Sequence, residues 1–156
     1  MNERRSAEDL ALEAELAEVE RTVAHRVDPG RTALTVTAAQ LVLLGSLVLP
    51  WTGAVRGWEI LAGSASFGLL PRLFALTAVG FGVLGSAVAL AGRRWGAAFA
   101  CAVGCGFSVV NGVWAVWSRQ VVVLHGASGP GIGLAVALVA MAVLTACWAR
   151  VAGRRG

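Results

Sequence analysis

Four apolar stretches, each long enough to cross a bilayer, constrain this 156-residue chain more than any other feature. They lie at residues 32–50, 71–92, 95–117 and 131–150. A hydrocarbon core about 30 Å thick needs roughly 20 apolar residues in helical form, and only helices or closed barrels pair every backbone polar group there. The sequence therefore predicts an all-α fold, a four-helix transmembrane bundle that fills residues 32–150.

Composition agrees with a membrane protein, since 57% of the residues are hydrophobic and only 14% are charged. A polar segment, residues 1–31, precedes the first apolar stretch. A signal peptide places its apolar region close behind a basic start, so we expect the first stretch to be retained as a span. Residues 151–156 form a short basic tail that we expect in the cytoplasm.

Arginine placement predicts the orientation of the spans. All thirteen basic residues are arginine, and if both termini are cytoplasmic, ten lie inside and only Arg56, Arg72 and Arg119 lie outside. Cytoplasmic loops carry such an excess of positive charge. Tryptophans, which favour the membrane interface, mark the predicted outer ends at Trp51, Trp58, Trp114 and Trp117 and the inner ends at Trp95 and Trp148. We predict a multi-pass protein of the bacterial inner (plasma) membrane, with N-terminus and C-terminus cytoplasmic.

The N-terminal segment differs in charge from the rest of the chain. Residues 1–31 hold five arginines and eight acids, a formal charge of −3, whereas the remainder carries +7. Ser6 and Asp9 resemble a capping box at a helix start. An apolar stripe follows at helical spacing, at Leu12, Leu16, Val19 and Val23. We predict a cytoplasmic amphipathic helix that either lies against the protein's own inner face or docks a cytoplasmic partner.

Small residues recur at every fourth position of the third stretch: Gly96, Ala100, Gly104, Ser108 and Gly112. In lipid, such rows let helix backbones approach closely, so we predict a helix-packing face. The second stretch repeats the spacing at Ala78, Gly82 and Ser86, and the two-residue connection between these stretches requires an antiparallel hairpin. Spacing leaves open whether the rows face neighbours within one chain or a second copy in a homo-oligomer.

Reactive residues form no recognisable catalytic group. Cys101 and Cys105 are separated by three residues, not the two of a Cys-x-x-Cys motif. His25 and His125 fall on opposite sides of the predicted membrane, which excludes a shared metal site. None of the nine acids falls within a predicted span, which disfavours an ion-coupled pump. We therefore predict no enzyme, no cofactor and no metal.

Asn111, in the outer part of the third span, is the most polar side chain predicted inside the membrane, and Gln40 lies in the first span. A buried amide in a membrane helix bonds a neighbouring helix or contributes to a polar pocket. Asn111 is accordingly a candidate for an intramembrane polar contact, with a ligand pocket as the alternative.

The first outer loop, "LPWTGAVRGWEIL", concentrates charge and aromatic residues. Arg56 and Glu59 share one face if residues 55–62 form a short helix along the outer surface. One interpretation is interfacial anchoring with an exposed ion pair that contributes little. The other is an outer docking surface for a protein partner or a lipid headgroup, with candidate residues Arg56, Trp58, Glu59, Arg119 and His125.

The whole chain, with its acidic N-terminal helix, its Ala/Gly/Val-rich spans and this outer loop, resembles small uncharacterised four-span integral membrane proteins of high-GC bacteria. That resemblance implies an architecture and assigns no catalytic residue.

These observations predict a non-enzymatic accessory or scaffold protein of the bacterial cell envelope that lies in the lipid bilayer and binds a protein partner. The alternative is a small transporter or lipid-binding membrane protein with a polar pocket near Asn111. The arginines account for the basic net charge of +4 through topology alone, so the sequence predicts no nucleic-acid partner.

Overall fold

The computed structural model describes residues 29–63, 68–92 and 95–153. Residues 1–31 and residues 32–156 form separate units. The predicted amphipathic helix, with the stripe Leu12, Leu16, Val19 and Val23, lies outside the described residues.

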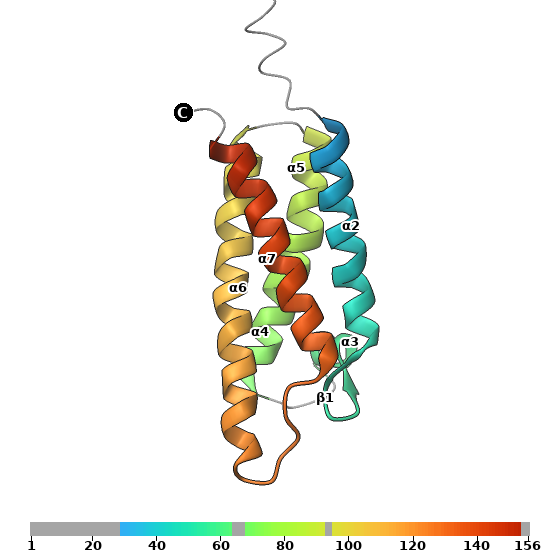
Figure 1. The fold of residues 1–156 in the computed structure, drawn as a ribbon, viewed down its shortest axis with the longest axis vertical. Coiled ribbons are helices and arrows are strands. Elements are labelled where there is room, and N and C mark those ends of the chain that lie inside the picture. Colours follow the sequence, from blue (N-terminus) through green and yellow to red (C-terminus); the bar gives the residue numbers. More distant parts are fainter. Residues whose placement is uncertain (1–28, 64–67, 93–94, 154–156) are drawn as a thin grey trace, which may run out of the picture. The chain divides into compact units, whose positions relative to one another are not determined.

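Five helices make up most of the described chain. They are α2 (Pro29–Val48), α3 (Gly57–Ala62), a long helix in three segments, α6 (Trp95–Val123) and α7 (Ile132–Gly153). The three-segment helix joins α4 (Leu69–Thr77), η1 (Ala78–Gly85) and α5 (Ser86–Gly92). Within the second unit the long helices alternate in direction, and the last turn of α7 lies at the same end as the first turns of α2 (Figure 1).

Within the described residues, three helices are long enough and apolar enough to cross a membrane: Leu69–Gly92, Gly96–Val123 and Ile132–Gly153. Thr32–Val48, within α2, is a shorter apolar helix. The third predicted span ends at residue 117, but α6 continues to Val123. It does so because residues 118–123 contain no glycine or proline. The first glycine with positive φ after residue 117 is Gly126.

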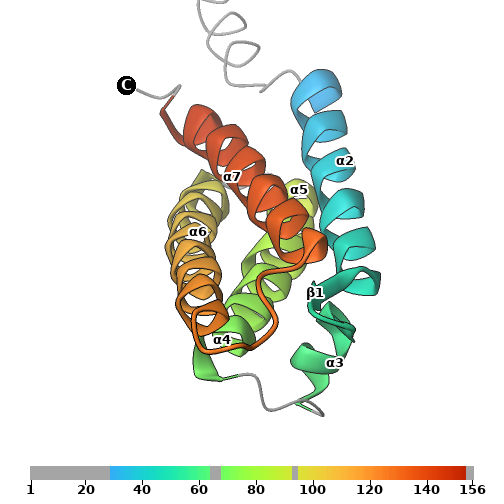
Figure 2. The ribbon, with the colours of Figure 1, turned by 60° about the horizontal axis from the view of Figure 1, so that its bottom comes forward.

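A small hairpin replaces part of the helix that the sequence predicts over residues 55–62. Strand β1 (Pro50–Thr52) pairs antiparallel with β2 (Val55–Arg56), and helix α3 begins only at Gly57. Gly53 turns the chain between the strands with a φ of 57°. The hairpin and α3 gather at the end of the bundle where α2 stops (Figure 2).

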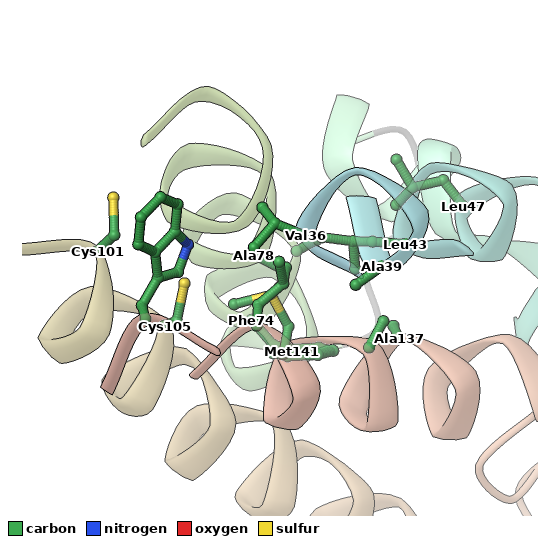
Figure 3. Packing of buried hydrophobic residues seen from close by; sticks show 14 of the residues in the cluster. Val36, Ala39, Leu43, Leu47, Phe74, Ala78, Cys101, Cys105, Ala137 and Met141 are labelled. Atoms are coloured by element: carbon green, nitrogen blue, oxygen red, sulfur yellow. The ribbon is translucent and has the colours of Figure 1, made fainter. Parts of the chain in front are cut away.

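The core is built from apolar side chains of α2, α4, η1, α6 and α7. Figure 3 shows members of this cluster, among them Val36 and Leu43 of α2, Phe74 of α4, Ala78 of η1 and Met141 of α7. Trp51 of β1 is fully buried, and its ring centroid lies 5.5 Å from that of Phe74. The hairpin therefore closes one end of the core.

Candidate functional site: a π-helical segment within the bundle

The least regular part of the described bundle is η1, where eight residues of a long apolar helix take π-helical form. A π-helix bonds each N–H to the carbonyl five residues back, and such segments are frequent at functional sites. Where π and α segments meet, the regular ladder of backbone bonds changes register. Side chains from two other helices bond to groups at this place.

Gln40 of α2 reaches across to η1. Its Nε2 donates to the backbone carbonyl of Val83 at 3.0 Å and to that of Gly82 at 3.3 Å. An unpaired carbonyl in hydrocarbon costs several kcal/mol, so an extra donor here stabilises the irregular segment. The sequence identified Gln40 as a polar residue but gave no sign of its partner, because nothing in the hydropathy pattern marks a π-helix.

Trp148 of α7 contacts the other end of the same segment. Its indole Nε1 donates to Ser86 Oγ at 2.8 Å, and Ser86 Oγ in turn donates to the Phe81 carbonyl at 3.2 Å. Trp148 and Ser86 are both buried. Trp148 therefore packs inside the bundle, whereas the sequence placed it at the inner membrane interface.

The side of η1 that faces the bundle is closely packed. A Cβ at Gly82 would lie 2.7 Å from Met141 Sδ and 2.8 Å from Leu43 Cδ2. A Cβ at Gly104 of α6 would collide with the ring of Phe81. Because α2, α6 and α7 all contact η1 at van der Waals distance or by hydrogen bonds, its inner side is closely packed, whereas Phe81 and Leu84 on its other side have 40% and 62% of their surface exposed.

The predicted packing row of α6 divides into two parts. Gly104, Ser108 and Gly112 are buried, whereas Gly96 and Ala100 are exposed. An α-helix turns about 100° per residue, so a four-residue row drifts about 40° at each step and roughly 160° from first to last member. One neighbour therefore cannot cover the whole row.

At the buried members of this row the contacts are specific. Ser108 Oγ lies 2.9 Å from Thr77 Oγ1 of α4. A Cβ at Gly112 would lie 2.8 Å from both Leu138 Cδ1 and Phe74 Cε2. Ser108 and Gly112 of the row thus face α4 and α7 of the same chain.

Asn111 and Arg119 occupy the buried side of α6 beyond this row, each with 8% of its surface exposed. Cys101 and Cys105 are buried farther back on the same helix, and Cys147 is buried on α7; all three are free thiols. Among the described residues, no group of three His, Cys, Asp or Glu could hold a metal ion.

The five outer-face candidates do not form one exposed surface. Arg56, Trp58 and His125 are exposed and Glu59 is partly exposed, but Arg119 points into the bundle because it follows Ala115 and Asn111 on the buried side of α6. His125 Nδ1 lies 3.4 Å from the Val121 carbonyl. The described contact between Arg56 and Glu59 runs from the Arg56 backbone N–H to Glu59 Oε2 at 2.9 Å. Glu59 thus caps the start of α3, which is a structural role.

The two connections that the sequence analysis placed outside are held together by backbone contacts. Gly131 N–H donates to the Trp51 carbonyl at 2.7 Å, and Thr52 bridges Pro130. Trp51 Nε1 donates to the Ser46 carbonyl at 2.8 Å. The sequence placed Trp51 at the membrane interface, but these bonds place it in the core.

A model of the MiaB C-terminal domain family matches residues 13–156. The chain belongs to the MiaB C-terminal domain family. It is also 42% identical, over 99% of its length, to the tRNA-2-methylthio-N(6)-dimethylallyladenosine synthase of Mycobacterium avium (strain 104). The chain spans 23% of the length of that synthase. No solved structure matches the chain.

These matches correct the sequence-based interpretation. The proposed kinship with small four-span proteins of no agreed activity is wrong, because the chain matches the MiaB C-terminal domain. The non-enzymatic envelope scaffold and its transporter or lipid-binding alternative are wrong as well, because the family and the similar protein both belong to an enzyme. The exclusion of nucleic acid conflicts with the name of the similar synthase, which refers to tRNA. The enzyme family was missed from the sequence because the apolar spans of this chain hold no motif of RNA-modifying chemistry.

Proposed function

We propose that this MiaB C-terminal domain is the membrane-embedded part of a tRNA-modifying methylthiotransferase and keeps that modification at the inner membrane. The observation that carries the proposal is the match of residues 13–156 to an enzyme's C-terminal domain, in a chain with three helices apolar and long enough to span a bilayer. Neither finding alone points to a membrane-bound tRNA enzyme.

The proposal includes a fourth span. Helix α2 contains 20 residues, which gives it a length of about 30 Å at 1.5 Å per residue, the thickness of a hydrocarbon core. Pro29 is its first residue, a position where proline costs no hydrogen bond. With α2 counted, the domain is a four-helix transmembrane bundle over residues 32–150, preceded by a cytoplasmic segment (residues 1–31) and followed by a short basic tail.

The positions of the arginines support an orientation in which both termini lie on the cytoplasmic side. Arg150 lies in the last turn of α7, and Arg93 and Arg94 follow the end of α5 in the sequence. Positive residues favour the cytoplasmic side, and in this topology both termini lie there. The remainder of a methylthiotransferase joined to the N-terminal side would then share a compartment with tRNA.

The test measures two quantities in the same cells: the modified-nucleoside content of tRNA and the methylthiotransferase activity of the membrane fraction. In the host bacterium, residues 29–153 are deleted, or replaced by an unrelated four-span bundle with both termini inside. We expect deletion to release methylthiotransferase activity from the membrane fraction and to lower the 2-methylthio-N6-dimethylallyladenosine content of tRNA, measured by mass spectrometry of digested tRNA.

The replacement separates two versions of the proposal. Restored membrane activity and tRNA content would show that membrane attachment suffices, and failure to restore them would show that this bundle has a specific part. An unchanged nucleoside content and an unchanged distribution of activity after deletion would contradict the proposal.

A further inference from the structure

The hydrogen bonds around η1 connect two helices that are far apart in sequence. Gln40 of α2 bonds the carbonyls of Gly82 and Val83, and Trp148 of α7 bonds Ser86, the first residue of α5. Ser86 follows Gly82 by four positions and Val83 by three, so the two attachments lie within one turn of helix. Any change of helical form within η1 alters both of them at once.

The π form itself depends on how its carbonyls are bonded. The Ser86 backbone N–H donates to the Phe81 carbonyl, five residues back, and also to that of Val83. In α-helical form the same N–H would donate to the Gly82 carbonyl instead, which is one of the two that Gln40 occupies. The amide of Gln40 supplies a donor to carbonyls where the α-helical ladder is interrupted, and so lowers the cost of the π arrangement.

A change to α-helical form would turn α5 relative to α4. A shift of one residue in helical register is about 100° of rotation. The small residues Ala78, Gly82 and Ser86, four apart, are all buried in the observed form. Rotation would carry Ser86 away from Trp148.

We infer that Gln40, η1 and Ser86 form a conformational joint, in which the Gln40 amide holds η1 in its π form and so positions α5 for its bond with Trp148. Gln40 is a positioning residue in this arrangement. Through the joint, the position of α2 relative to η1 determines how far α5 is rotated about its own axis relative to α4. The joint does not depend on the role in tRNA modification.

The test uses the full-length chain, isotopically labelled, in lipid bilayers, with solid-state NMR as the readout. Gln40→Leu removes both donors at nearly constant volume, and Gln40→Met does the same with a more flexible chain. Thr37→Leu, on the exposed side of the same helix, is the matched control. The observed signals are the backbone 13C′ resonances of Gly82 and Val83 and the indole N–H resonance of Trp148.

We expect both Gln40 variants to shift the Gly82 and Val83 carbonyl resonances and also the Trp148 indole resonance, and the Thr37 control to shift none of them. The Trp148 signal is decisive, because Gln40 bonds Gly82 and Val83 and not Ser86. A change at the two carbonyls without a change at Trp148 would overturn the inference, since Gln40 would then be a local packing residue.

A second variant covers the case in which neither Gln40 variant folds. Coupling between two sites is reciprocal, so Trp148→Phe, which removes the bond to Ser86, should shift the side-chain amide resonance of Gln40. An unchanged Gln40 amide in a folded Trp148→Phe protein would overturn the inference independently.

Discussion

Helix α2 and the pair α6–α7 are attached to the bundle in different ways. The backbones of α6 and α7 approach within 8 Å along much of their length, whereas α2 comes that close to other helices at few places. In α6, Gly112 allows close approach to Leu138 of α7. Helix α2 instead uses the larger side chains Val36 and Leu43 and the single amide of Gln40. Close backbones give α6 and α7 extensive van der Waals contact; α2 depends on a few side chains.

Close backbone packing therefore cannot be inferred from small residues alone, because the same pattern has two outcomes within α6. Gly104 and Gly96 belong to one predicted row, but a Cβ at Gly96 would meet nothing within 4 Å. Substitutions at these two positions separate a packing glycine from an incidental one.

The largest effect is expected for Gly104→Leu. The new side chain must displace the Phe81 ring, and overpacking typically costs about 1–3 kcal/mol, with the upper end expected beside an aromatic ring. Thermal unfolding in mild detergent measures the loss. Gly96→Leu is the matched control and should be neutral or slightly stabilising, because glycine is a poor helix former. Equal melting temperatures would show that the row makes no tight contact.

Leu43→Ala tests how α2 is held. Leu43 is fully buried against Gly82, and truncation of a buried leucine costs about 2–5 kcal/mol in soluble proteins. We expect about 2 kcal/mol here, because lipid can occupy part of the space at a peripheral helix. Leu44→Ala, with 41% of its surface exposed, should change the free energy of unfolding little. If Leu44→Ala costs as much as Leu43→Ala, the buried stripe of α2 is not what attaches it.

Trp148→Phe removes one hydrogen bond at the α7 side of η1. Interhelical hydrogen bonds in membranes contribute about 0.6 kcal/mol on average, with a maximum of about 1.7, so we expect a loss of about 1 kcal/mol. The same exchange at Trp114, which is 60% exposed, leaves the core unchanged and serves as the control. A loss above about 3 kcal/mol would mean that ring volume, not the hydrogen bond, dominates at this position.

Glu59→Gln should have the smallest effect. The glutamine oxygen can still accept the Arg56 N–H, so only the favourable charge at the start of α3 is lost, about 0.3–1 kcal/mol. Melting temperature at low and high salt measures it, and the difference from wild type should shrink at high salt. A large loss that salt does not change would identify Glu59 as part of a buried ion pair.

The sequence predicted the helices well because long apolar runs leave few alternatives in a bilayer. It could not predict which tryptophans are anchors. Trp58, Trp114 and Trp117 are exposed, while Trp51 and Trp148 are buried with their N–H groups bonded. All five lie near the ends of apolar runs, and only their partners, Ser46 and Ser86, distinguish the two kinds.

The candidate site was mostly hidden from sequence reasoning. Gln40 was visible as a polar residue in an apolar run, but its acceptors are backbone carbonyls, which carry no sequence signal. The π form of η1 was hidden for the same reason, since uniformly apolar residues fit α and π geometry equally. The family emerged only by comparison with other proteins, because the spans hold no residues that mark RNA chemistry.

The bond between Gly131 and Trp51 has a mechanical consequence for α2. It fastens the chain just beyond Val48 to the start of α7, so any tilt of α2 would pivot about that end. From Val48 to Thr32 the helix is about 25 Å long at 1.5 Å per residue. A tilt of about 10° would then move Thr32 by roughly 4 Å while scarcely moving the fastened end. The greatest travel thus falls where the helix meets the N-terminal segment, and the Gln40 amide lies midway between the pivot and that moving end.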